Sequence, residues 1–230
     1  MIKHVFFDLD RTLWDYETNS KLALKDLFYK YNIDKTGADF DEFVEAYSQV
    51  NTRLWKEYGA GHIDKEKLRK TRFRLTLKKF KITNKPLADK MDEEYISISP
   101  LQTALTPHAE KVLNYLSAKA YKLYIITNGF TETQNLKLHT CGLETYFEHV
   151  YTSEATGKQK PSPEIFRYVM KDIRALPEDC IMIGDDFEVD ILGAASAGIA
   201  QIYYNPEGVC RIEGKATYEI SSLDEIEKIL

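Results

Sequence analysis

The feature of this sequence that most constrains its fold is the alternation of short apolar runs with stretches of helical periodicity. The strong runs are HVFF (4–7), KLYIIT (122–127), CIMIG (180–184) and IAQIYY (199–204), and the weaker ones are HVYTS (149–153) and YEI (218–220). Apolar strands that alternate with helices indicate a parallel sheet covered on both faces. We therefore predict an α/β fold with a Rossmann-like parallel core and helices on both faces.

Two helices are predicted between the later runs. Pro163 suits the first position of a helix, and an apolar stripe at helical spacing follows it to about Ile173. The second helix should begin after Gly184 and end at Gly198.

The segment 15–99 contains no convincing strand and shows helical spacing of its apolar residues. The stripes are Leu24–Leu27–Phe28–Tyr31, Phe40–Phe43–Val44–Tyr47 and Phe73–Leu77–Phe80. We expect an all-helical domain of residues 15–99, inserted into a core built from 1–14 and 100–230.

Composition excludes several classes of protein. With 31 basic and 36 acidic residues the net charge is −5, which does not favour nucleic-acid binding. No apolar run approaches the roughly 18 residues of a membrane span, and no signal-peptide pattern follows Met1. The cysteines Cys141, Cys180 and Cys210 are odd in number and form no close pair, which argues against a disulfide framework. We expect a cytoplasmic protein, either monomer or homodimer.

One segment departs from this overall charge. Residues 65–85 contain ten Lys or Arg and one acid, Glu66. We favour a solvated outer helix face, since amphipathic helices carry their charges there. The alternative is a positive field that attracts an anionic substrate.

Polar residues follow the apolar runs at the ends where ligands bind in an open parallel sheet. The candidates are Asp8 and Asp10 after the first run, Thr127 and Asn128 at the end of the second, Lys160 before the helix at 163, and Asp185, Asp186 and Asp190 after the third. Carboxylates are the ligands that Mg²⁺ prefers. One acid could attack phosphorus, a second could move protons, and a lysine and a hydroxyl could hold phosphoryl oxygens. This inventory predicts phosphoryl transfer.

The segments DLDRTL, ITNG, the Lys160–Pro161 pair and GDDFEVD, in this order, resemble the four motifs of the haloacid dehalogenase superfamily of phosphohydrolases. The helical insert lies where that superfamily carries its first type of cap domain. The resemblance implies a phosphatase that uses Mg²⁺, for which Mn²⁺ could substitute, and a small phosphomonoester as its partner.

The resemblance also implies a role for each motif residue. Asp8 would be the nucleophile and a metal ligand, and Asp10 the general acid and base whose backbone carbonyl also binds the metal. Thr127 and Asn128 would hold the phosphate, and Lys160 would steady the nucleophile and the transferring group. Asp185 would bind the metal directly, and Asp190 through a water.

Two further positions, Asp186 and Arg11, lie next to the motif residues. Asp186 would either join the metal site or cap the following helix. Position 11 is Arg where many members of the superfamily have Gly, which changes the flexibility and charge of the turn.

Two further segments, LWKEYGAGHIDKEKLRKTRF and ITNGFTETQ, look like the pyrimidine 5'-nucleotidases of the superfamily. This likeness implies a nucleoside 5'-monophosphate substrate, with Trp55, Arg72 and Phe73 as candidate substrate contacts. For Trp55 and Phe73 taken singly, we favour the alternative that each belongs to the core of the insert. For Arg72 we expect an exposed side chain, because a long cation in a basic segment has little reason to be buried.

Other functions share some of these features. A sugar-phosphate phosphatase or a phosphomutase of the same superfamily would carry the same motifs. A haloacid dehalogenase is disfavoured by Asp10, because the true dehalogenases lack an acid there. A nucleic-acid-binding module would leave the clustered acids without a role.

Overall fold

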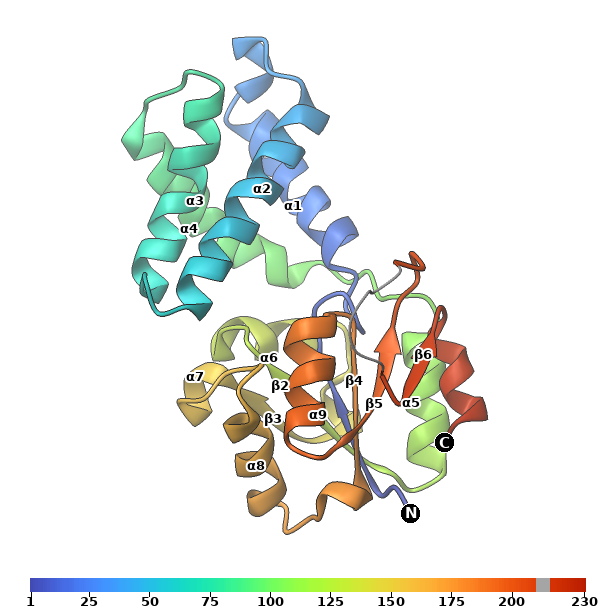
Figure 1. Cartoon of the computed structure of the whole chain (residues 1–230). Coiled ribbons are helices and arrows are strands. Elements are labelled where there is room, and N and C mark those ends of the chain that lie inside the picture. Colours follow the sequence, from blue (N-terminus) through green and yellow to red (C-terminus); the bar gives the residue numbers. More distant parts are fainter. Residues whose placement is uncertain (210–215) are drawn as a thin grey trace. The chain divides into compact units, whose positions relative to one another are not determined.

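The computed structural model describes residues 1–209 and 216–230 of the chain (Figure 1). The chain divides into two compact units, Met1–Tyr16 with Thr103–Leu230, and Glu17–Gln102. Among the described residues, no helix is long and apolar enough to cross a membrane. Cys141 and Cys180 are free thiols, and Cys210 lies outside the described residues.

The first unit is built on a six-stranded parallel sheet in the order β3-β2-β1-β4-β5-β6. Its strands are β1 (His4–Phe7), β2 (Lys122–Thr127), β3 (Phe147–Thr152), β4 (Cys180–Gly184), β5 (Ala200–Tyr204) and β6 (Tyr218–Ile220). The predicted parallel α/β core is therefore confirmed. Strand β1 lies in the middle, with Phe7 level with Ile125 of β2 and Ile183 of β4.

The two faces of the sheet are covered by separate apolar layers. On β1, Val5 and Phe7 belong to one layer and Phe6 to the other, because successive side chains of a strand point to opposite faces. The first layer is completed by α5 (Ala109–Ala118), α6 (Thr131–Thr140) and η6 (Leu223–Lys228). The second is completed by α8 (Pro163–Asp172) and α9 (Gly193–Ser196). Short elements are η3 (Glu144–Tyr146), α7 (Ser153–Thr156) and η4 (Pro177–Asp179).

The helix predicted after Gly184 is interrupted. A π-helix, η5 (Phe187–Leu192), precedes the single α-turn of α9, and Gly198 follows with a φ of 80°. The wider turn occurs in the segment that carries Asp190, and π-helical segments are frequently found at functional sites. The apolar pattern alone could not distinguish this element from an ordinary helix.

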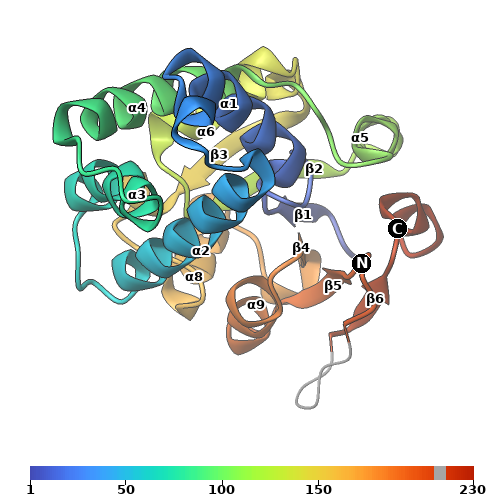
Figure 2. The same cartoon turned by 90° about the horizontal axis from the view of Figure 1, so that it is seen from above.

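The second unit is all-helical, as predicted, and its helices gather into one bundle (Figures 1 and 2). The helices are α1 (Tyr16–Lys30), α2 (Phe40–Gly59), α3 (Lys65–Lys79) and α4 (Lys85–Ile98), with the short turns η1 (Ile33–Thr36) and η2 (Ser99–Leu101). Asp39, Asp64 and Asn84 accept backbone hydrogen bonds at the starts of α2, α3 and α4. Helix α4 was not predicted, because Asp92 occupies its buried stripe.

The expectation that Arg72 is exposed was wrong: its residue exposure is 7%. Its Nε lies 3.6 Å from Asp92 Oδ1, and its guanidinium lies 5.2 Å from the centroid of the Tyr95 ring. Burial raises the pKa of Asp92 to about 7, although the Arg72 charge opposes that shift. Arg72 is buried because an acid on the neighbouring helix is buried with it.

This buried acid should make stability depend on pH. The pKa of Asp92 is 3.8 without perturbation and about 7 in the folded chain, so the folded state binds a proton more tightly than the unfolded state. Its contribution to the free energy of unfolding is therefore complete below the lower value and is lost as pH rises through the upper one. The loss is at most about 4 kcal/mol, since a tenfold change in proton affinity corresponds to about 1.4 kcal/mol.

The substitution Asp92→Asn removes this titration and should flatten that part of the pH profile. We would compare melting midpoints of the two proteins between about pH 4.5 and pH 8, a range that covers the titration of Asp92. Both proteins would be measured in the same series of buffers, so that all other titrating groups contribute equally to the two profiles. Parallel profiles for wild type and variant would contradict the assignment.

Candidate active site

The site lies at the carboxyl edge of the sheet in the first unit. Asp8 directly follows β1, Thr127 is the last residue of β2, and Asp185 directly follows β4. Because β1 lies between β2 and β4, the parallel register brings these three residues to one place.

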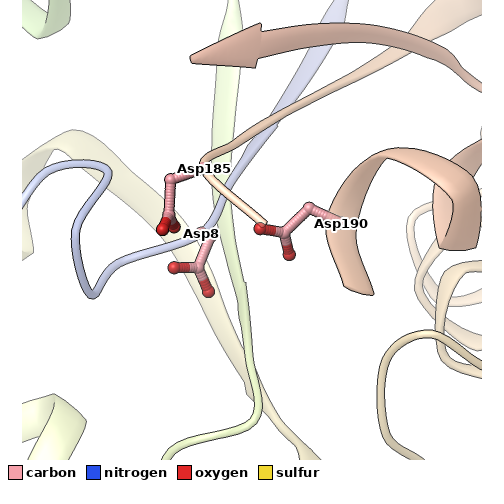
Figure 3. A group of neighbouring side chains, drawn as sticks. All are labelled: Asp8, Asp185 and Asp190. Atoms are coloured by element: carbon pink, nitrogen blue, oxygen red, sulfur yellow. The ribbon is translucent and has the colours of Figure 1, made fainter. Parts of the chain in front are cut away.

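Three carboxylates meet there (Figure 3). Asp8, Asp185 and Asp190 each offer an oxygen, and these oxygens all lie within 4.8 Å of one another. Asp190 comes from η5 and is 1% exposed, and Asp8 is 8% exposed. Gly184 makes room for this approach, since a Cβ at that position would lie 2.3 Å from Asp190 Oδ2.

Burial and mutual repulsion both oppose ionisation of these acids. Burial raises the pKa of Asp8 to about 7, and burial together with the charges of Asp8 and Asp190 raises the pKa of Asp185 to about 8. The pKa of Asp190 is raised as well, mainly by burial. Such a group is stable in its ionised form only beside positive charge.

Lys160 supplies one positive charge to the cluster. Its Nζ lies 2.6 Å from Asp8 Oδ1 and 2.6 Å from Asp190 Oδ1, and the residue is 3% exposed. Burial would lower the pKa of Lys160, but the two carboxylates raise it above its ordinary value, so the ammonium stays charged. Three carboxylates and one ammonium leave a formal charge of −2. A divalent cation with oxygen ligands therefore fits this donor set in charge and in chemistry.

The side chain of Asn128 is engaged with the backbone of Lys160. Its Nδ2 donates to the Lys160 carbonyl at 2.8 Å, and its Oδ1 accepts from the Lys160 amide at 2.9 Å. This pair of bonds holds the loop that carries the lysine. Thr127 lies beside it at the edge and is 2% exposed.

Asp10 has partners of its own. One carboxylate oxygen pairs with Lys137 Nζ, and the other accepts from Gln134 Nε2 at 2.9 Å. Burial alone would raise the pKa of Asp10, but the Lys137 charge and these hydrogen bonds lower it overall. Asp10 therefore does not share the environment of Asp8, although the two residues are two positions apart.

Three residues of the site were not predicted from the sequence. Gln134 and Lys137 are buried on α6, and the Thr12 hydroxyl donates to Asp185 Oδ1 at 3.3 Å. The available signal was the position of Gln134 and Lys137 beside Leu138 in the buried stripe of α6, where a polar residue needs a partner.

The other residues noted in the sequence lie outside the group of three acids. Asp186 caps η5, because its Oδ1 accepts from the amides of Glu188 and Val189 at 3.0 Å each. Arg11 adopts a φ of 66° in the left-handed region, and its guanidinium lies 4.3 Å from the centroid of the Tyr16 ring. In the second unit, Phe73 is fully buried in the core and Trp55 is half-buried.

A sequence model of the haloacid dehalogenase-like hydrolases matches residues 2–198, so this chain belongs to that family. It is 33% identical over 228 residues to the pyrimidine 5'-nucleotidase YjjG of Escherichia coli, covering 98% of this chain and 96% of that one. It is 33% identical over 210 residues to a glyceraldehyde 3-phosphate phosphatase of Methanothermobacter thermautotrophicus, covering 90% and 87%.

Among solved structures, the putative HAD-hydrolase YfnB of Bacillus subtilis, bound to magnesium, superimposes with a TM-score of 0.88. The identity is 30%, and the match covers 99% of this chain and 98% of that one. Fold, site and relatives together identify a phosphoric monoester hydrolase.

A divalent cation should stabilise the folded chain through the three acids. Mg²⁺ at about 100 times its dissociation constant would add about 2.7 kcal/mol to the free energy of unfolding. Asp190→Asn should lose most of the resulting rise in melting midpoint, because it removes a buried ligand. Asp186→Asn is the matched control, since an asparagine can still cap η5. Melting curves recorded with Mg²⁺ and after chelation would show the difference. An equal rise in melting midpoint with Mg²⁺ in both variants would contradict a place for Asp190 in the metal site.

Proposed function

We propose that this hydrolase cleaves the phosphate monoester of a small metabolite through an aspartyl-phosphate on Asp8, and that a nucleoside 5'-monophosphate is its preferred substrate. The observation that carries the proposal is the position of Asp8. Its carboxylate is buried beside the Lys160 ammonium and two further acids, at the carboxyl end of the central strand.

In the first half of the reaction, an Asp8 oxygen attacks phosphorus and forms a new P–O bond. The bond from phosphorus to the leaving oxygen breaks, and its electron pair stays on that oxygen, which takes a proton from protonated Asp10. Lys160 holds Asp8 in place through its hydrogen bond. Alcohol and aspartyl-phosphate are the products.

In the second half, water attacks the aspartyl-phosphate while Asp10, now ionised, accepts a proton from it. The bond between phosphorus and the Asp8 oxygen breaks, inorganic phosphate leaves, and the Asp8 carboxylate is restored. The Lys137 pairing lowers the pKa of Asp10 and favours its ionised form, which this second step requires. The first step draws on the protonated form, whose proton is the one that Asp10 accepts from water in this second step of the preceding turnover.

Asp8, Asp185 and Asp190, with the backbone carbonyl of Asp10, would hold Mg²⁺, and Mn²⁺ could substitute. When bound, the cation would offset the negative charge of the carboxylates and of the phosphoryl group. The magnesium in the YfnB structure supports this choice of metal.

Thr127 and the backbone amides near it would hold phosphoryl oxygens. The Asn128 side chain would act on the phosphate through Lys160, whose loop it holds. Lys160 would contact the transferring group as well as Asp8.

The likeness to YjjG supports a nucleotide substrate, and the likeness to the glyceraldehyde 3-phosphate phosphatase keeps a sugar phosphate as the second candidate. The residues at the sheet edge would contact the phosphoryl group, which a nucleotide and a sugar phosphate have in common. We therefore assign the choice between them to the helical unit, where Trp55 remains a candidate contact. Phe73 and Arg72 are already used in the core of that unit.

The test is release of inorganic phosphate from a panel of nucleotides and sugar phosphates. Asp8→Asn should lower kcat by roughly 10³-fold or more, because an amide is a poor nucleophile. Asp186→Asn should keep most of the activity. A phosphomutase would instead yield an isomeric sugar phosphate with little free phosphate. Substantial turnover by Asp8→Asn would contradict the covalent route.

Asp10→Asn should affect esters according to their leaving group. A nucleoside 5'-monophosphate leaves as an alkoxide that needs a proton, so its kcat should fall by about 10²-fold or more. Nitrophenolate needs little protonation, so nitrophenyl phosphate should still form the aspartyl-phosphate, which then accumulates because its hydrolysis is slow. Rapid-quench detection of phosphorylated enzyme would show this. Equal loss with both esters and no phosphoenzyme would contradict the role of Asp10.

A further inference from the structure

Helix α6 contributes two polar side chains to the interior of the first unit. Gln134 is fully buried and Lys137 is 5% exposed. Both contact Asp10, which precedes them by more than a hundred residues in the chain. In the mechanism described above, Lys137 enters only through its effect on the pKa of Asp10, and Gln134 has no role.

Lys137 is held on two sides. Its ammonium pairs with Asp10 Oδ1, and it lies 4.0 Å from the centroid of the Trp14 ring. Trp14 is 1% exposed, so the ring cannot easily move away. A buried ammonium needs such partners, because leaving it unpaired would be costly. The position of the cation thus determines where one oxygen of Asp10 can lie.

Gln134 joins Asp10 to Thr127. Its Nε2 donates to Asp10 Oδ2 at 2.9 Å and to Thr127 Oγ1 at 2.7 Å. An ionised carboxylate only accepts hydrogen bonds, so the amide nitrogen must face it and the orientation of the amide is set. Gly129 leaves the space for this side chain, since a Cβ there would lie 2.1 Å from Gln134 Nε2.

The same contacts set the direction of the Thr127 hydroxyl. Its oxygen accepts from Gln134 Nε2 and from the Gly129 amide, the latter at 3.1 Å. A hydroxyl accepts two hydrogen bonds and donates one. Both accepting positions are therefore used, and the proton remains to be donated. A donor at this edge of the sheet suits an anionic phosphoryl oxygen.

The arrangement leaves one polar atom unsatisfied. Gln134 Oε1 is buried and has no hydrogen-bond partner among the described residues. A glutamine placed only to stabilise the fold would gain by using both ends of its amide, because an unpaired buried acceptor is destabilising. The Gln134 side chain is therefore placed so that Nε2 reaches both Asp10 and Thr127, although this leaves Oε1 without a partner among the described residues.

We propose that Gln134 and Lys137 are positioning residues: together they hold both oxygens of the Asp10 carboxylate, and Gln134 sets the Thr127 hydroxyl as a donor to the phosphoryl group. This inference rests on the roles given above to Asp10 and Thr127. The alternative is that the two residues only anchor α6 to the sheet.

The experiment uses Lys137→Met and Gln134→Met, which keep side-chain length and remove the polar contacts. Lys137→Arg keeps the cation, and Gln134→Glu keeps the shape without the amide donors. The matched controls are Lys122→Met, which breaks an exposed ion pair with Glu148, and Gln201→Met, which removes another buried glutamine. Each protein is measured for kcat and KM with nitrophenyl phosphate and a nucleoside 5'-monophosphate, and for melting midpoint in Mg²⁺. Binding of inorganic phosphate is measured by calorimetry.

Lys137→Met should lower kcat for the nucleotide about tenfold more than for the aryl ester, because a misplaced acid matters most for the poorer leaving group. Lys137→Arg should recover part of this loss. Gln134→Met and Gln134→Glu should show the same discrimination and should also weaken phosphate binding by about tenfold, since the Thr127 hydroxyl is no longer directed. Both controls should treat the two esters alike.

An equal loss of kcat with both esters, together with unchanged phosphate binding, would overturn the proposal. Two substitutions are made at each position, so this outcome can be read even if one of the two variants does not fold. If Asp10→Asn itself fails to discriminate between the esters, the acid and base role of Asp10 is wrong. If Asp10→Asn discriminates and the α6 variants do not, only the positioning role is wrong.

Discussion

The contact on which the rest of the site depends is the one between the Lys160 ammonium and the carboxylates of Asp8 and Asp190. Three acids close together, two of them buried and Asp185 half-buried, would otherwise repel one another strongly. Several unrelated features of the chain serve this contact. Asn128 holds the backbone of Lys160, Gly184 admits the Asp190 carboxylate, and Gly193 lies so near Pro161 that a Cβ there would be 3.0 Å from its Cα.

Asp8 and Asp10, the two acids that follow β1, contact different partners. Asp8 lies with Lys160, with Asp185 after β4 and with Asp190 of η5, whereas Asp10 lies with Lys137 and Gln134 from α6. Burial raises the pKa of Asp8, and the Lys137 charge helps to lower that of Asp10. Two carboxyl groups in such different surroundings are suited to different tasks, one as nucleophile and one as proton carrier.

The strands were predicted well from the sequence, but the contact partners of the buried charged residues were not. The bounds of β1, β2 and β4 coincide with the apolar runs, because strands buried on both faces are continuous in hydrophobicity. The motif acids follow from the same reasoning, since they end those strands. Lys137 could not be paired with Asp10 in this way, because the contact joins residues 127 positions apart. Arg72 was misjudged for the same reason, since its burial depends on Asp92 of another helix.

Each unit contains an ion pair whose cation is buried beside an aromatic ring, yet the two carboxylates differ in access to solvent. In the helical unit, the Asp92 side chain is 4% exposed and Arg72 is covered beside Tyr95. In the first unit, the Lys137 side chain is 6% exposed, but that of Asp10 is 27% exposed. A carboxylate as buried as Asp92 cannot reach a substrate, so it affects only the stability of the helical unit. The Asp10 carboxylate is partly exposed, so it could exchange a proton with a substrate or with water. In the proposal made here, its contacts with Lys137 and Gln134 determine where that exchange would take place.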